Sequence, residues 1–125
     1  MSTYYAKALL DFGVYHDSGY LSPLVQKTLA RFATAADTFQ AVELSVPNTT
    51  FTAVLQGTWT AATDILIIND SGASIVVTGV TGDTGLTIAT GGFFFVTKAS
   101  IASSGIGVYQ SSGSAKVITV VAFGT

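Results

Sequence analysis

One sequence pattern constrains the fold of this chain more than any other, because it occurs twice. In residues 64–80, two runs rich in Ile and Val flank the polar sequence Asn69-Asp70-Ser71-Gly72. Asn and Asp tolerate left-handed backbone angles, Gly adopts a positive φ without a steric clash, and β-branched residues favour strands. The segment therefore predicts a β-hairpin.

Residues 106–123 repeat this design 41 positions later. The identical pairs in register are Ile65/Ile106, Ser71/Ser112, Gly72/Gly113, Val76/Val117, Thr78/Thr119 and Val80/Val121. These matches have two alternative explanations, duplication of one segment or convergence on hairpin chemistry. Under either explanation the sequence predicts two equivalent hairpins, and neither shows a catalytic constellation.

Composition narrows the class of protein. The 125 residues fit one domain, and the absence of Cys means that packing alone must stabilise it. Five Lys and Arg against seven Asp and Glu, net charge −2, argue against a nucleic-acid partner. No apolar run approaches the ~20 residues of a membrane span. The mean hydropathy of +0.57 is high, so we expect apolar surface to be buried between subunits.

Residues 1–37 differ from the rest, since they hold the only His and four of the five Tyr. Ser22-Pro23 suits a helix start, and a helical stripe follows it at Val25, Leu29, Phe32 and Ala36. The sequence thus predicts an N-terminal arm with a short helix at about residues 23–33. Residues 4–15 fit either a helical face or an edge strand. No secretory signal is visible at the N-terminus, which predicts synthesis in the cytoplasm.

From residue 38 onward, short apolar runs alternate with turns bearing Gly or Ser. Besides the two hairpins, the pattern predicts strands at residues 39–46, 51–56, 58–63, 87–89 and 93–97. About eight strands in residues 38–125 indicate an all-β domain, either a β-sandwich or a jelly roll.

The residues that could carry chemistry are few. His16 is the only imidazole and lies in the least regular segment, and Asp64, Asp70 and Asp83 are explained by turn and capping roles. The glycines spaced by three in residues 79–85 lack the Lys and the strand-to-helix context of a phosphate loop. We therefore expect no catalytic residue, no cofactor and no metal site. A small hydrolase dependent on His16 is the weakest alternative.

Aromatic residues are the candidates for binding. Successive residues of a strand point to opposite faces, so Phe93-Phe94-Phe95 implies either burial on both faces or a contact with another subunit. The predicted oligomer or attachment interface consists of Tyr4, Tyr5, Tyr15, Tyr20, Phe32 and Phe94. A glycan-binding alternative would use Trp59, Tyr20 and Tyr109 as stacking rings, although a single Trp in an alternating strand is more often a core residue.

The last strand carries a family resemblance. The sequence from Gln110 to Gly124, QSSGSAKVITVVAFG, resembles the terminal hairpin of small virion structural proteins of tailed bacteriophages: Asn-x-Ser-Gly, a small residue, a charged residue, then Val-x-Val-x-x-x-Gly. Asn69-Asp70-Ser71-Gly72 repeats the turn, and the resemblance covers residues 38–125. It implies a sandwich or jelly-roll subunit of a capsid decoration, head fibre or tail, working as a multimer.

The resemblance implies location in the virion and partners among virion proteins such as a major capsid or tail protein, and it carries over no catalytic residue. Because a small chain with few charges has little to keep its apolar surface monomeric, we expect a homo-oligomer of closed symmetry, with a trimer favoured. A carbohydrate- or receptor-binding module of a phage tail is the alternative function.

Overall fold

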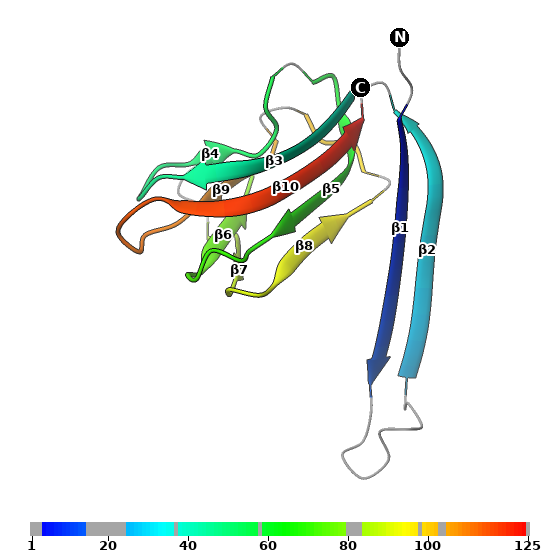
Figure 1. Cartoon of the computed structure of the whole chain (residues 1–125), viewed down its shortest axis with the longest axis horizontal. Coiled ribbons are helices and arrows are strands. Elements are labelled where there is room, and N and C mark those ends of the chain that lie inside the picture. The colour runs from blue at the N-terminus through cyan, green and yellow to red at the C-terminus, as the bar shows by residue number, and fades with distance from the viewer. Residues whose placement is uncertain are drawn as a thin grey trace. The chain divides into compact units, whose positions relative to one another are not determined.

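The computed structural model describes residues 4–14, 25–36, 38–57, 59–79, 84–97, 99–102 and 105–124, with side chains described from residue 40 onward within these ranges. Every regular element in the described ranges is a strand (Figure 1). The strands are β1 (Tyr4–Val14), β2 (Val25–Ala36), β3 (Thr38–Val46), β4 (Thr52–Ala53), β5 (Ala62–Ile68), β6 (Ile75–Thr78), β7 (Leu86–Ile88), β8 (Phe93–Val96), β9 (Gly107–Tyr109) and β10 (Lys116–Gly124). The prediction of an all-β fold is confirmed.

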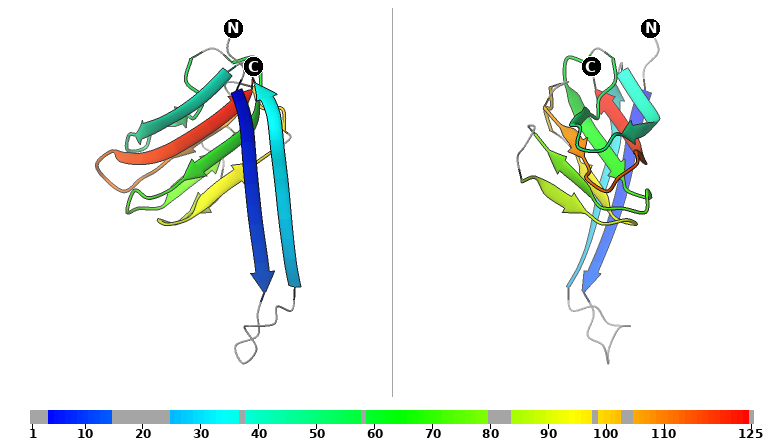
Figure 2. Two further views of the ribbon diagram at one scale, coloured as in Figure 1. Left: turned by 45° about the vertical axis from the view of Figure 1, so that its right-hand side comes forward. Right: turned by 90° about the vertical axis from the view of Figure 1, so that its left-hand side faces the viewer.

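Strands β3 to β10 form two four-stranded antiparallel sheets, ordered β3-β10-β5-β8 and β4-β9-β6-β7. The first strand of this set pairs with the last, β4 pairs with β9, β5 with β8, and β6 with β7. This nested pairing is that of one long hairpin wound onto itself, which is the jelly-roll topology. Figure 2 shows the two sheets from two further directions.

The two predicted hairpins are wrong, although both turns occur where the sequence places them. β5 pairs with β10 and β8, whereas β6 pairs with β7 and β9, so the turn between β5 and β6 connects the two sheets. The turn between β9 and β10 connects the sheets in the same way. Local turn chemistry fixes where the chain reverses, but long-range pairing decides which strand becomes the neighbour.

The core lies between the two sheets and is built by alternation along the strands. In β5, Ile65 and Ile67 are buried, and in β10 the buried residues are Ile118, Val120 and Ala122. The other sheet contributes Ile75, Val77, Ile88 and Val108. Residues 59–61, which the sequence predicts to begin a strand, lie outside the strands, and Trp59 packs in the core there.

β1 and β2 form a separate two-stranded sheet. Residues Tyr5–Ala35 make up one compact unit of the chain, and the sandwich belongs to the other. The predicted helix is wrong for residues 25–33, which lie in β2. The helical stripe there is overridden because strand pairing with β1 satisfies the backbone equally well, and Val, Thr and Phe in this stretch suit a strand. Pro23 and Leu24 lie outside the described residues.

Candidate functional site

The two repeated turns share one arrangement, in which a buried side-chain amide holds the turn. At the first turn the fully buried Asn69 donates from Nδ2 to the carbonyls of Ala73 and Ile88, both at 2.8 Å. Its Oδ1 accepts from the backbone N and the Oγ of Ser71, at 3.2 and 2.7 Å. The amide therefore ties the turn to β7, in the sheet that β5 does not join.

Gln110 repeats this network at the second turn. Its Nε2 donates to the carbonyls of Ser114 and Val46, at 3.2 and 3.0 Å. Its Oε1 accepts from the N and the Oγ of Ser112, at 2.8 and 2.9 Å. The glycines that follow, Gly72 and Gly113, both have positive φ, at 85° and 87°. The sequence repeat is thus a repeated inter-sheet anchor, with Asn and Gln in equivalent roles.

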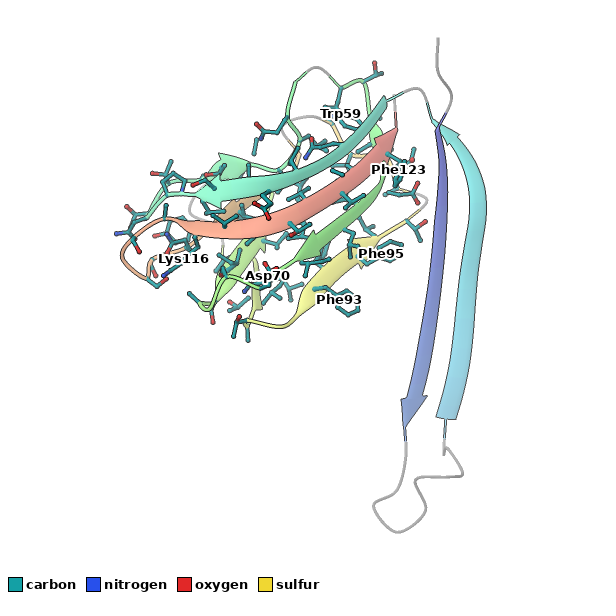
Figure 3. All side chains as sticks on the ribbon, in the orientation of Figure 1. Trp59, Asp70, Phe93, Phe95, Lys116 and Phe123 are labelled. Carbon is teal, nitrogen blue, oxygen red and sulfur yellow. The ribbon has the colours of Figure 1, made fainter. Side chains whose placement is uncertain are left out.

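Four loops meet at the end of the sandwich that carries these anchors, and they are linked in two pairs. In the first pair, Thr49 N, in the β3–β4 loop, donates to Gln110 O at 2.8 Å. In the second, Asn69 N donates to Gly92 O and Gly91 N donates to Asn69 O, joining the β5–β6 and β7–β8 loops. Figure 3 places Asp70 and Lys116 in this region. The loops therefore form a polar end whose backbone is held by its own hydrogen bonds.

A second surface is apolar. We call it the outer face, meaning the side of the β3-β10-β5-β8 sheet that points away from the core. By strand register and alternation it carries Ala41, Glu43, Ser45, Val117, Thr119, Val121, Phe123, Asp64, Leu66, Ile68, Phe93 and Phe95. Figure 3 shows Phe93 and Phe95 on β8, and Phe123 on β10.

The apolar residues of the outer face are contiguous across strands. Leu66 pairs with Val121 on one side and with Phe95 on the other, and the next row joins Ile68 to Phe93. Phe93 is 58% exposed and Val117 is 47% exposed. Sheets that face water usually carry polar residues on that side, so this face has the composition of a buried one.

Among the acids whose side chains the structure describes, Asp64 is the buried one, with 5% of its surface exposed. Its Oδ2 accepts a hydrogen bond from Thr63 Oγ1 at 2.8 Å, and its Oδ1 accepts one from Thr97 Oγ1. Thr63 Oγ1 also donates to the Phe123 carbonyl at 3.2 Å. These contacts link β5 to β10 and to the residue that follows β8, so the carboxylate has a structural role in this sheet.

The predicted binding residues fall into different places. Tyr4 and Tyr5 lie in β1 and Phe32 lies in β2, whereas Tyr15, Tyr20 and His16 lie outside the described residues. Phe94 packs against the core, and its neighbours Phe93 and Phe95 occupy the outer face.

The two remaining aromatic candidates differ in exposure. Trp59 is 6% exposed and donates from Nε1 to the Gln56 carbonyl at 2.9 Å, so its ring is part of the core. Tyr109 is partly exposed on the outer side of the other sheet, where it pairs with Val76.

Sequence reasoning singled out Phe93-Phe94-Phe95 in β8 but missed the part of the outer face on β5 and β10, although a signal was present. In the runs Ile65-Leu66-Ile67-Ile68 and Val120-Val121-Ala122-Phe123, apolar residues are continuous and do not alternate with polar ones. Continuous apolar strands indicate burial on both faces. Sequence reasoning also missed the anchor role of Gln110, whose long side chain is an uncommon replacement for Asn in a turn.

Among the residues that the structure describes, no group of three or more His, Cys, Asp or Glu side chains lies close enough to hold a metal ion. The same described ranges contain no helix long and apolar enough to cross a bilayer. Comparison of the chain with protein-family models, with curated proteins and with solved structures finds no match.

Proposed function

We propose that this chain is a non-enzymatic bacteriophage virion structural protein, a capsid decoration or cement subunit or a related head or tail subunit, that assembles as a homo-oligomer. The observation that carries the proposal is the contiguous apolar outer face, with Leu66, Val121 and Phe95 in register across three strands. Burying such a face between subunits is favourable at about 25 cal/mol per Å² of apolar area.

Three further features support a structural role. Jelly rolls recur in capsid domains. The two amide anchors bind the sheets to each other at one end, which favours a rigid building block. The resemblance of residues 110–124 to terminal hairpins of phage virion proteins points to the same class, and by that class the chain is made in the host cytoplasm and resides in the virion.

The test is the location of the chain in particles. Phage virions that encode this chain would be purified and analysed by mass spectrometry, and by negative-stain microscopy with an antibody to this chain. The proposal predicts many copies per particle and label on a fixed part of the head or tail. Particles that lack the chain would refute it.

A carbohydrate- or receptor-binding module is the second candidate, and one observation favours it. On the outer side of the β4-β9-β6-β7 sheet, Tyr109 lies two residues from Gly107, and the ring of Phe51 lies over Gly107 so closely that a methyl group there would overlap it. Aromatic rings on an open sheet face can stack on sugars. Glycan binding that disappears in Tyr109→Ala and survives in Tyr109→Phe would support this function, and a glycan array without signal would count against it.

A further inference from the structure

The sequence repeat extends to the strand pairing of the sandwich. Its first four strands, β3 to β6, form one half and its last four, β7 to β10, form the other. Every strand pairing that the structure describes in the sandwich joins one half to the other. The two sheet orders, β3-β10-β5-β8 and β7-β6-β9-β4, become the same when each strand is exchanged for the one four places away in the chain. The halves are therefore related by a pseudo-two-fold axis.

The loops follow the same equivalence. The anchors Asn69 and Gln110 are 41 positions apart, and the backbone oxygen of each accepts a hydrogen bond from the other half. Thr49 N donates to Gln110 O at 2.8 Å, and Gly91 N donates to Asn69 O at 2.6 Å. Both donor residues have positive φ, 54° at Thr49 and 87° at Gly91, although this is uncommon for a β-branched residue. The strand topology does not require this match, so it favours duplication over convergence.

One equivalent pair of positions differs in size. Gly107 in β9 and Leu66 in β5 are 41 positions apart, and each pairs with a strand of the other half, Gly107 with Ala53 and Leu66 with Phe95. The ring of Phe51 lies over Gly107 so closely that a Cβ atom there would overlap it. A glycine inside a strand often marks such a close approach. Only Gly at this position accepts the ring.

The equivalent aromatic residue in the other half is Phe93. Each of the two Phe residues comes two positions before the strand partner of residue 107 or 66. Leu66 stands where Gly107 stands in the other sheet, and its Cβ atom would overlap a ring placed like that of Phe51. Phe93 is accordingly 58% exposed, whereas Phe51 is partly buried.

We infer that the sandwich consists of two copies of one four-strand module, and that the residue at position 66 or 107 decides where the paired Phe ring lies. Gly107 holds the Phe51 ring on the sheet, and Leu66 keeps the Phe93 ring exposed. Leu66 thus determines which of the two sheets presents a free aromatic ring, the kind of side chain that anchors protein interfaces. The inference goes beyond the proposed function and does not depend on it.

Proton NMR of the full chain labelled with ¹³C-glycine tests the role of residue 66. A ring stacked over a glycine shifts its α-proton resonances upfield, so those of Gly107 should lie upfield in the parent and at ordinary values in Phe51→Ala. In Leu66→Gly the α-protons at position 66 should also lie upfield, and adding Phe93→Ala should remove this displacement. Ordinary shifts at position 66 in a folded Leu66→Gly chain would overturn the inference.

Exchange of the two turns tests the equivalence of the modules without changing position 66. Residues 69–74 and 110–115 are exchanged in the full chain, and Asn69→Ala is the comparison. The urea midpoint of the exchanged chain should fall by less than half of the fall in Asn69→Ala, because each amide meets an equivalent carbonyl, that of Ile88 or Val46. An equal or larger fall would overturn the inference.

Light scattering on the same samples separates this inference from the proposed function. A parent chain that is a monomer would refute the proposed assembly, whereas the α-proton shifts and the urea midpoint would still decide on the modules.

Discussion

Removing either buried amide should destabilise the sandwich by about 3 kcal/mol, because each holds the same four hydrogen bonds. In Asn69→Ala the turn loses two donors to the Ala73 and Ile88 carbonyls and two acceptor contacts to Ser71. A typical hydrogen bond contributes a net ~1 kcal/mol, and a carbonyl left buried without a partner costs about 1–3 kcal/mol. The expected loss of about 3 kcal/mol is smaller than the sum of these contributions, because the turn relaxes and water replaces part of the lost hydrogen bonding.

Gln110→Ala should cost the same within about 1 kcal/mol, since its four contacts are equivalent. Ser74→Ala in the exposed part of the first turn is the matched control and should stay within about 0.5 kcal/mol of the parent. Urea unfolding followed by fluorescence measures these differences well, because the single Trp59 is buried. All samples need one protein concentration, since oligomers gain stability by mass action. A loss below about 1 kcal/mol for both amide variants would refute the anchor role.

Three further predictions follow from packing. Gly107→Ala should cost about 1–3 kcal/mol, because the added methyl meets the Phe51 ring, and Phe51→Leu in the same chain should recover part of that loss in urea unfolding. Phe94→Ala should destabilise by ~2 kcal/mol because Phe94 packs on the core. Thr87→Ser, at an exposed position of the other sheet, is the control and should change stability by less than about 0.5 kcal/mol; equal losses would contradict this assignment. Deleting residues 1–37 should leave a β domain that melts cooperatively but loses its oligomeric state, and aggregation or binding of a hydrophobic dye would show instead that the segment closes the core.

The strands that follow from local chemistry were predictable. Alternation located β3, and the aromatic run at 93–97 located β8, because side-chain period and residue type act within one segment. The turns at Asn69 and Gln110 were also visible in the repeat. The pairing partners of the strands that flank these turns were not visible. The sheet that a strand joins depends on pairing between distant parts of the chain, such as β10 with β3 and β5.

The helix predicted for residues 23–33 failed for a related reason. A stripe at Val25, Leu29 and Phe32 satisfies helical spacing, but the same residues fit a strand when a long partner is available, and β1 is such a partner. The burial of Trp59 agrees with the expectation that such a Trp is a core residue, but the strand predicted around it is wrong, since Trp59 lies in a loop. Its burial depends on the loop after β4, where its indole meets the Gln56 carbonyl, and no local pattern reports that contact.

The most direct test of the central claim, that subunits assemble through the outer face, is the molar mass of the full chain and of two charged variants in solution by light scattering. Leu66→Glu introduces a charge into the middle of the outer face, and Thr87→Glu places the same charge on the other sheet. We expect an oligomer, with a trimer favoured, for the parent and for Thr87→Glu. Leu66→Glu should be a monomer, and its Trp59 fluorescence should report an intact core. Phe93→Glu, at an exposed position of the same face, is a second variant and should give the same result. A parent that is monomeric at tens of micromolar, or face variants that retain the parent's molar mass, would contradict the central claim.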